Sequence, residues 1–343
     1  MIAGIIKITI ALCATIMQAA PPALERFEFQ QPHMGTIARI ILYASNREAA
    51  QKAASDAFAR IAQLDAAYSD YREDSELTQF CRQAGKGPVR IGPDLFQILT
   101  IAKDWSAKTR GVFDVTAAPV IQLWRRARRT RQLPDPARLE EARHLTDYRR
   151  LRLDPEKRTA ELRRAGMRID LGGIAKGYAA DQALAVLVKQ GIDRALVALG
   201  GDIVVGQAPP QTSGWPIGVA ALDNPNRPPT MFLSLENAAV SSSGDTEQYV
   251  VIDGVRYSHI VDPRTGLGVT GHSNTTVVAR RGVTADLLAT TLSILGPVEG
   301  LRLLDSLAGY DSTLAARFVD GRQEVVSRKW KSKLTRPGAS GPG

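Results

Sequence analysis

The chain has 343 residues, of which 44% are hydrophobic and 23% charged, and its formal net charge is +9. This length and composition allow a substantial core and exclude a disordered or fibrous protein. The positive charge would suit an acidic partner or anionic lipid. Nucleic acid is excluded as a partner, because no aromatic residues interleave with the clustered arginines and no nucleic-acid-binding motif is present.

The first twenty residues have the pattern of an export signal. Lys7 is followed by the apolar run 8–17, and small residues precede Pro21. This order predicts a signal peptide over residues 1–20 and an exported, periplasmic location, with an association with the membrane left open. The apolar run is short for a membrane span, which needs about 20 residues; a buried N-terminal helix is the alternative. Without the signal peptide, Cys81 has no partner for an internal disulfide.

The next part of the chain is expected to begin with extended backbone over residues 26–44, interrupted by a turn at residues 32–35. Apolar residues then recur at the spacing of amphipathic helices, and Gly111 is placed to end the second of them. The helices predicted in this way span residues 47–67, 94–109, 119–129 and 135–145.

The second half is richer in short strand-like runs. Helices and strands fall in separate groups, which predicts an α+β fold for one domain, residues 26–328. The polar end of the chain, residues 331–343, is expected to be disordered. The predicted strands span residues 151–153, 167–171, 194–199, 202–205, 215–220, 231–235, 249–252, 255–261 and 274–279, followed by helices at 284–295 and 297–307 and a hairpin of 312–319 with 323–327.

Five arginines fall close together near the end of the third predicted helix. Two interpretations are open: a solvated helix end, or a contact surface for an acidic partner or anionic lipid. The cluster consists of Arg125, Arg126, Arg128, Arg129 and Arg131.

Two apparent motifs carry no chemistry. Residues 266–271 match the dinucleotide pattern G-x-G-x-x-G, but a strand is expected to follow them, whereas that motif requires a helix. The four histidines lack the spacing of zinc ligands. A dinucleotide-binding motif and a zinc site are therefore excluded.

The segment from Asp170 to Asp181 predicts a strand, a Gly172-Gly173 turn and a new helix. The two glycines let a ligand approach the backbone closely, and the helix N-terminus offers free N–H groups to a phosphate. Lys176 lies in the first turn, where its charge opposes the helix dipole, and could reach that phosphate. The alternative is an ordinary strand–turn–helix with an exposed lysine.

Two further segments carry side chains suited to metal binding and proton transfer. Asp286 and Thr290 are four residues apart in a helix expected to start at its N-cap Thr284, so a carboxylate and a hydroxyl share one face that could hold a hard cation. His259 lies on a predicted strand just before the turn at residues 262–266, a rigid position for a general base. Taken singly, Asp286 is equally explained as an acid in a first helical turn, and the turn after His259 as structural.

Together, these segments resemble the ApbE family of FAD:protein FMN transferases. The resemblance covers about residues 30–320, and it implies the α+β fold of that family, with layers like those of the tunnelling fold. It rests on DLGGIAKGYAAD at 170–181, GGD at 200–202, SSGD at 242–245, YSHIVDPRTG at 257–266 and DLLAT at 286–290, with MGT at 34–36, YREDSEL at 71–77 and GVFDVT at 111–116 upstream.

The resemblance implies a reaction and its participants. Family members bind FAD and Mg²⁺, cut the FAD pyrophosphate, attach FMN to a Thr or Ser hydroxyl of an acceptor protein, and release AMP. The acceptor is expected to be a membrane or exported redox protein. The resemblance assigns Mg²⁺ to Asp286, Thr290 and a backbone carbonyl near Gly173, and the role of base to His259. It assigns FAD contacts to Met34, Tyr71, Val112, Phe113, Asp114, Asp170, Lys176 and the backbone near Ile260.

Two other functions stay open. Water could replace the acceptor hydroxyl, which would give an FAD pyrophosphatase that releases free FMN and AMP. A non-catalytic FAD-binding protein is the other hypothesis, against which His259, Asp286 and Thr290 argue. Self-flavinylation is not expected, because the chain has no D-G-x-[ST]-G-A-T acceptor segment. The sequence departs from the family at residues 244–247, where an aromatic residue often follows the Gly-Asp pair.

Overall fold

The computed structural model describes residues 23–222, 227–246, 248–321 and 323–335. The predicted signal peptide lies outside these residues, as does the end of the chain from residue 336. The predicted disorder is wrong for residues 331–335, because Trp330–Lys333 forms a 3-10 helix and Leu334 makes a β-bridge with Leu233.

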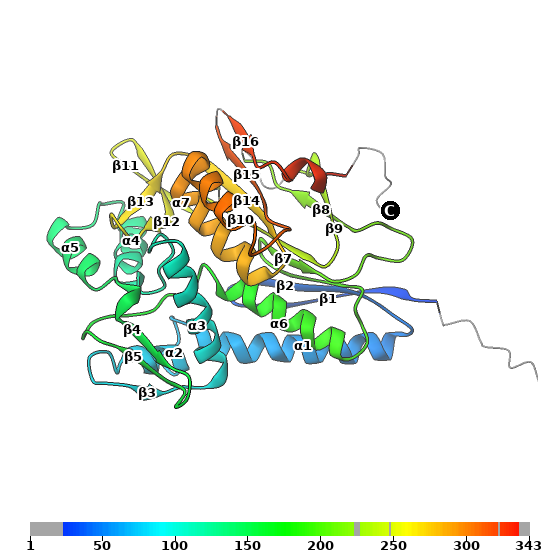
Figure 1. Cartoon of the computed structure of the whole chain (residues 1–343), viewed down its shortest axis with the longest axis horizontal. Coiled ribbons are helices and arrows are strands. Elements are labelled where there is room, and N and C mark those ends of the chain that lie inside the picture. The colour runs from blue at the N-terminus through cyan, green and yellow to red at the C-terminus, as the bar shows by residue number, and fades with distance from the viewer. Residues whose placement is uncertain (1–22, 223–226, 247, 322, 336–343) are drawn as a thin grey trace, which may run out of the picture.

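Within the described residues, one eight-stranded antiparallel sheet organises the molecule (Figure 1). Its strand order is β1-β2-β6-β7-β10-β14-β15-β16. The sheet consists of β1 (Glu25–His33), β2 (Thr36–Ala44), β6 (Ala195–Leu199), β7 (Asp202–Val205), β10 (Ala238–Gly244), β14 (Ser273–Ala279), β15 (Ala315–Asp320) and β16 (Glu324–Val326).

Three helices cover one face of this sheet: α1 (Arg47–Tyr68), α6 (Ala175–Lys189) and α7 (Gly282–Ser306). Figure 1 shows α1 and α6 running side by side and α7 lying over the middle strands. α1 starts at Asn46, whose side chain caps the helix by accepting from the Ala49 N–H, and the apolar positions that predicted this helix are buried.

Gly296 divides α7 into two helical parts. Its backbone has φ 70° and ψ −179°, a conformation open to glycine, and Pro297 follows it. The two helices predicted here, 284–295 and 297–307, are therefore confirmed as the two arms of one kinked element.

Smaller sheets and helices complete the fold. β11 (Tyr249–Ile252), β12 (Val255–Asp262) and β13 (Leu267–Thr270) pack with α4 (Ala118–Thr130) and α5 (Pro136–His144). The hairpin of β8 (Trp215–Val219) and β9 (Met231–Leu235), with Trp330, covers the second face of the large sheet. The remaining elements are α2 (Glu76–Cys81), β3 (Val89–Arg90), α3 (Pro93–Lys108), a 3-10 helix (Tyr148–Arg150), β4 (Leu151–Asp154) and β5 (Thr159–Leu162).

The predicted α+β class is confirmed, and seven described elements were missed: α2, β3, β5, β10, β13 and the two 3-10 helices. β10 is central in the sheet, yet its sequence AAVSSSG has few β-branched residues, so only its packing makes it a strand. The strand predicted at 167–171 is wrong: within it only Arg168 forms a bridge, to Ala117. The turn already begins at Asp170, the fourth of these five residues, because its Oδ1 accepts from the Gly172 N–H.

Candidate active site

The turn after Asp170 presents an open helix end. Leu171 O accepts from the N–H groups of Ile174 and Ala175, and α6 begins at Ala175 without a side-chain cap. N–H groups in the first turn of a helix have no partner within the helix, and together with its dipole they suit a phosphate. Of the N–H groups in the first turn of α6, that of Ala175 donates to Leu171 O and that of Gly177 to Asp286 Oδ2, which leaves the Lys176 N–H for a phosphate. The Lys176 ammonium belongs to the same turn.

A partly buried ion-pair network, in which Asp170 is the buried member, connects this turn to α4. Arg125 binds two carboxylates, those of Asp70 and of Asp170, the second at 2.6 Å from Nη2. Burial raises the pKa of Asp170, and the charge of Arg125 opposes that rise. Asp170 is therefore held by Arg125 and Gly172 on the chain itself, in the position assigned to nucleotide contact. The sequence did not predict that Arg125 and Asp70 form ion pairs in the site, because both lie far from Asp170 along the chain.

Tyr71 supplies an exposed aromatic face beside this network. Its side chain is 78% exposed, and the Arg125 guanidinium lies 4.8 Å from its ring centre. A large aromatic ring left in solvent next to a polar cradle is suited to stacking on a planar ligand such as a flavin or an adenine.

The predicted FAD contacts at residues 112–114 offer no free polar side chain, and the Phe113 ring lies 3.6 Å from a Cβ placed on Gly173. Val112 and Phe113 are buried. Asp114 is also buried, and its carboxylate accepts from Thr116 N–H and Oγ–H and from the Tyr148 N–H. Burial raises the pKa of Asp114, and these hydrogen bonds oppose that rise. The side chain of Asp114 therefore holds its own loop.

Met34 lies in the turn between β1 and β2. Its backbone has φ 50°, and its N–H donates to Asp65 Oδ2 at 2.9 Å. A non-glycine residue in the left-handed region costs free energy unless its surroundings hold it there, and Asp65 on α1 does so. Its contact with FAD stays a prediction.

The predicted metal ligands come together where α6 and α7 cross. A Cβ placed on Gly173 would lie 3.1 Å from Thr290 Oγ1, and Gly177 on α6 packs directly on Gly282 of α7. Asp286 Oδ2 accepts from the Gly177 N–H at 3.0 Å. Because the two helices lie so close, a bound ion could contact both Gly173 and the helix face that carries Asp286 and Thr290.

The N-cap predicted for α7 is wrong. The helix begins at Gly282, two residues before Thr284, and its first N–H groups are bound by the Asp181 carboxylate of α6. Gly282 N–H donates at 2.7 Å and Val283 N–H at 3.1 Å. The cap is supplied by a residue about a hundred positions earlier, so no local pattern could reveal it. Asp286 and Thr290 keep their shared face.

Lys176 bridges two carboxylates, one of which has no role in the sequence-based predictions. Its Nζ lies 2.7 Å from Asp202 Oδ2 and 4.0 Å from Asp286 Oδ2. Burial lowers the pKa of Lys176, but the two carboxylates outweigh burial and raise it overall. Burial and the charge of Asp202 raise the pKa of Asp286 to about 7, although the charge of Lys176 acts to lower it. The Gly-Gly-Asp block at 200–202 was the available signal for Asp202.

This donor set fits a hard divalent cation. The described residues contain no group of three or more His, Cys, Asp or Glu side chains that could hold a metal. They do contain a buried carboxylate, a hydroxyl and a main-chain segment at Gly173, all oxygen donors of the kind that Mg²⁺ takes, with water and phosphate completing its shell. Two carboxylates near one ammonium leave negative charge that a cation would neutralise.

His259 lies on β12 as predicted, and a bulge sets its direction. The pairing of β12 with β13 shifts between Tyr257 and Val261, so the residues between them have no regular partners on β13. Bulges of this kind re-aim side chains and free backbone groups beside active sites. The freed N–H of Ile260 is bound by Ser258 Oγ at 3.1 Å.

The ring of His259 has a defined proton arrangement. Its Nδ1 lies 3.2 Å from the Gln248 carbonyl oxygen, which only accepts, so Nδ1 carries the proton in the neutral ring and Nε2 carries the lone pair. Burial lowers the pKa of His259, and the charges of Arg128 and Lys176 lower it further, whereas Gln248 and Asp245 oppose this. The arrangement is that of a neutral base. Because the charge of Lys176 lowers the His259 pKa, the group proposed to bind phosphate also helps to keep the ring neutral.

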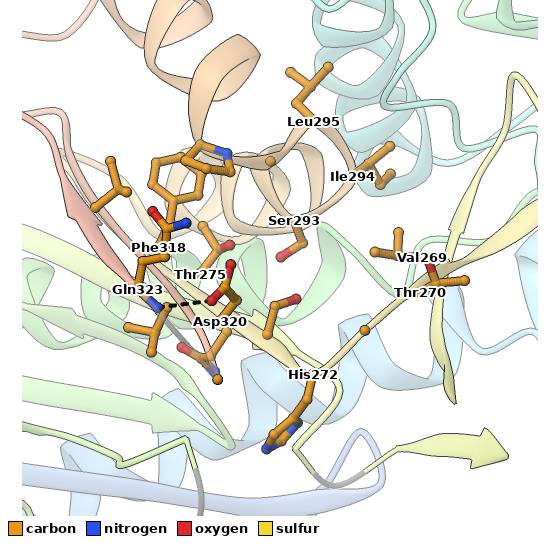
Figure 2. Close-up of a pocket in the computed structure, with 18 residues that line it drawn as sticks. Val269, Thr270, His272, Thr275, Ser293, Ile294, Leu295, Phe318, Asp320 and Gln323 are labelled. Carbon is orange, nitrogen blue, oxygen red and sulfur yellow. Dashed lines mark hydrogen bonds between the residues drawn. The ribbon is translucent and has the colours of Figure 1, made fainter. Parts of the chain in front are cut away.

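A separate cavity of about 670 Å³ lies beside these residues, between the kink of α7 and β14–β16. Figure 2 shows Ser293, Thr275 and Phe318 at its wall, with Phe318 beside Thr275, its partner across β14 and β15. None of the predicted site residues lines it. Ser293 is one turn beyond Thr290, and its hydroxyl donates to the Ala289 carbonyl and to the Ser243 carbonyl. The cavity therefore adjoins the site without containing its chemistry.

Known proteins are similar to this chain both in sequence and in fold. The sequence model of the ApbE family matches residues 34–314. The FAD:protein FMN transferase of Treponema pallidum is 33% identical over 295 residues, 81% of each chain. That of Klebsiella pneumoniae is 30% identical over 273 residues, 78% of this chain and 83% of the relative.

Two solved structures are similar to this chain in fold. The ApbE protein of Thermotoga maritima superposes with a TM-score of 0.82 at 25% identity, over 91% of this chain and 100% of that chain. The flavin transferase ApbE of Vibrio cholerae has a TM-score of 0.80 at 25% identity with the same coverage. The order of motifs, the fold and these similarities agree: the chain belongs to the ApbE family.

Proposed function

We propose that this chain is an Mg²⁺-dependent FAD:protein FMN transferase that attaches FMN to a Thr or Ser hydroxyl of an acceptor protein. The observation that carries the proposal is the convergence of Lys176, Asp286 and Thr290 at the open N-terminus of α6, with His259 held as a neutral base. The relatives are named for the transfer of FMN from FAD to a protein, which supports the proposal in its general form.

The chain's own residues account for each part of the reaction. The Lys176 backbone N–H at the start of α6 and the Lys176 ammonium bind the pyrophosphate, while Tyr71 and the Asp170 network orient the nucleotide. Asp286, Thr290 and the Gly173 backbone would hold Mg²⁺, which supplies neutralisation of phosphate charge when bound.

His259 is the residue that accepts a proton in the reaction. Its Nε2 takes the proton of the acceptor hydroxyl as the oxygen attacks the phosphorus of the FMN half. The new oxygen–phosphorus bond forms, the pyrophosphate oxygen–phosphorus bond breaks, and AMP leaves with the bridging oxygen. A neutral His259 is needed for this step, which agrees with its lowered pKa.

The test is a mass measurement. The mature protein is incubated with FAD, Mg²⁺ and a domain carrying the D-G-x-[ST]-G-A-T segment, and the domain is then weighed. A gain of one FMN less one water supports transfer. Free FMN with an unmodified domain supports the pyrophosphatase, and unchanged FAD supports a binding protein; either result overturns the proposal.

Export is a separate part of the proposal. It is supported by Lys7, the apolar run after it and the small residues before Pro21. An exported redox protein, in the membrane or free, would be the acceptor in that compartment. N-terminal sequencing of the protein recovered from a periplasmic fraction tests the location, and an intact Met1 in the cytoplasmic fraction would contradict it.

A further inference from the structure

The arginine cluster of α4 is divided by the packing of the helix. Arg126, Arg129 and Arg131 are exposed, as a solvated helix end predicts. Arg125 and Arg128 are three residues apart, so they share a face, and both are half-buried. Arg125 binds Asp170, and Arg128 donates from Nη1 to Gln248 Oε1 at 2.8 Å. The interpretation as a purely solvated helix end is therefore wrong for these two residues.

Gln248 is the residue that orients His259. Its carbonyl oxygen accepts from the His259 backbone N–H at 3.0 Å and lies 3.2 Å from Nδ1 of the ring. A guanidinium only donates hydrogen bonds, so Arg128 holds the Gln248 side chain by its oxygen. A chain of contacts thus runs from α4 through Gln248 to the imidazole.

We propose that Arg128 is a positioning residue for His259, which through Gln248 keeps Nδ1 protonated and leaves Nε2 free to take a proton. The inference rests on the proposed function, because it assigns a purpose to the orientation of the base. It adds a residue to which the family resemblance gave no role.

The charge of Arg128 favours the neutral imidazole, because it lowers the His259 pKa, whereas the hydrogen bond from the Gln248 carbonyl raises that pKa. The charged groups that act on the imidazole are Arg128 from α4, Lys176 from α6 and Asp245 after β10; the first two lower the His259 pKa and Asp245 raises it. Loss of Arg128 removes one lowering charge, so the His259 pKa rises. More of the ring is then protonated near neutral pH, where it cannot accept a proton.

Three variants separate these contributions. Arg128→Met removes the hydrogen bond and the charge, and Gln248→Met removes the hydrogen bond but keeps the charge and the backbone carbonyl. Arg129→Met is the matched control, because it removes an exposed charge from the same helix.

The first measurement does not depend on activity. NMR of the full mature chain labelled with ¹⁵N reports the tautomer and the titration midpoint of the His259 ring. The wild type and Arg129→Met are expected to show the Nδ1–H tautomer with the same midpoint. Arg128→Met is expected to mix the tautomers and move the midpoint to higher pH, and Gln248→Met to mix the tautomers with a smaller change of midpoint.

The second measurement is FMN transfer against pH. Arg128→Met is expected to lower kcat at neutral pH by about 10-fold, as loss of a partner that orients a functional histidine does, with the acid limb moved to higher pH and KM for FAD unchanged. An unchanged tautomer and midpoint in Arg128→Met would overturn the proposal, whatever the transfer rate. If that variant does not fold, an unchanged tautomer in Gln248→Met overturns it.

Failure of the proposed function gives a different result. If His259→Ala transfers FMN at the wild-type rate, His259 is not the base. The NMR changes in Arg128→Met would in that case still support the orientation of His259 by Arg128.

Discussion

The Lys176 ammonium lies 2.7 Å from the Asp202 carboxylate, and this pair stands beside the proposed metal ligand Asp286. Asp202 also accepts from Ser241 Oγ at 2.6 Å, so both of its oxygens are bound. The arrangement keeps the lysine charge partly engaged with Asp202 and leaves Asp286 available to a cation.

Asp202→Asn is expected to raise the Mg²⁺ concentration needed for half-maximal transfer, because Lys176 then pairs with Asp286 and competes with the metal. The free energy of unfolding should fall by about 1–3 kcal/mol through loss of a charged hydrogen bond. Magnesium titration and urea unfolding measure the two effects. Ser241→Ala, which removes only the neutral partner of Asp202, is the control; an unchanged magnesium requirement in Asp202→Asn would contradict the competition.

Asp286→Ala is expected to abolish turnover, because the carboxylate proposed to hold Mg²⁺ is lost. Removal of Mg²⁺ from the wild type with a chelator should have the same effect, reversed by added Mg²⁺. The measurement is FMN transfer with and without metal. Persistent turnover of the chelated wild type would show that no metal is needed.

His259→Ala is expected to reduce transfer by about 10²- to 10⁴-fold while FAD binding is spared, because a general base contributes on this order. The base works above its pKa, and the pKa of His259 is lowered. In the wild type the rate should therefore stay level through neutral pH and fall only at pH below the usual histidine range. Rate–pH profiles and FAD titrations measure this, and full activity of the variant would remove His259 from the mechanism.

Arg125→Met is expected to weaken FAD binding and to lower the free energy of unfolding by about 3 kcal/mol, because Asp70 and Asp170 lose their shared cation in a buried place. Without Arg125 the pKa of Asp170 rises further, so the loss of FAD binding should be greatest at low pH. FAD titration and chemical unfolding test both points. Arg126→Met, an exposed neighbour on the same helix, should change neither.

Gly177→Ala is expected to destabilise the crossing of α6 and α7. An added Cβ would lie 2.2 Å from the Gly282 carbonyl oxygen, so the helices must move apart. Overpacking of this kind costs about 1–3 kcal/mol, and it would also pull Asp286 away from Gly173. Thermal unfolding measures the loss of stability, and magnesium affinity measures the displacement of Asp286. Gly309→Ala is the control, since a Cβ there meets nothing within 4 Å; equal stability of the two variants would refute the close packing.

Local properties of the chain were enough for the longer helices and for the main site segments. The spacing of apolar residues in α1, the Gly172-Gly173 turn and the four-residue interval from Asp286 to Thr290 depend only on neighbours in sequence, and each is present in the structure. The kink at Gly296 was likewise signalled by glycine followed by proline. The order of the motifs then identified the family, although no single motif could.

Contacts between distant segments were beyond the reach of the sequence. β10 is a strand because β7 and β14 supply its hydrogen bonds, and Asp181 caps α7 because α6 lies against it. Two of the clustered arginines face the site and three face solvent, a division set by how α4 packs. Periodicity and turn chemistry act over a few residues, whereas Arg125, Arg128, Asp202 and Gln248 acquire their roles from charges and carbonyls that folding alone brings within hydrogen-bonding distance.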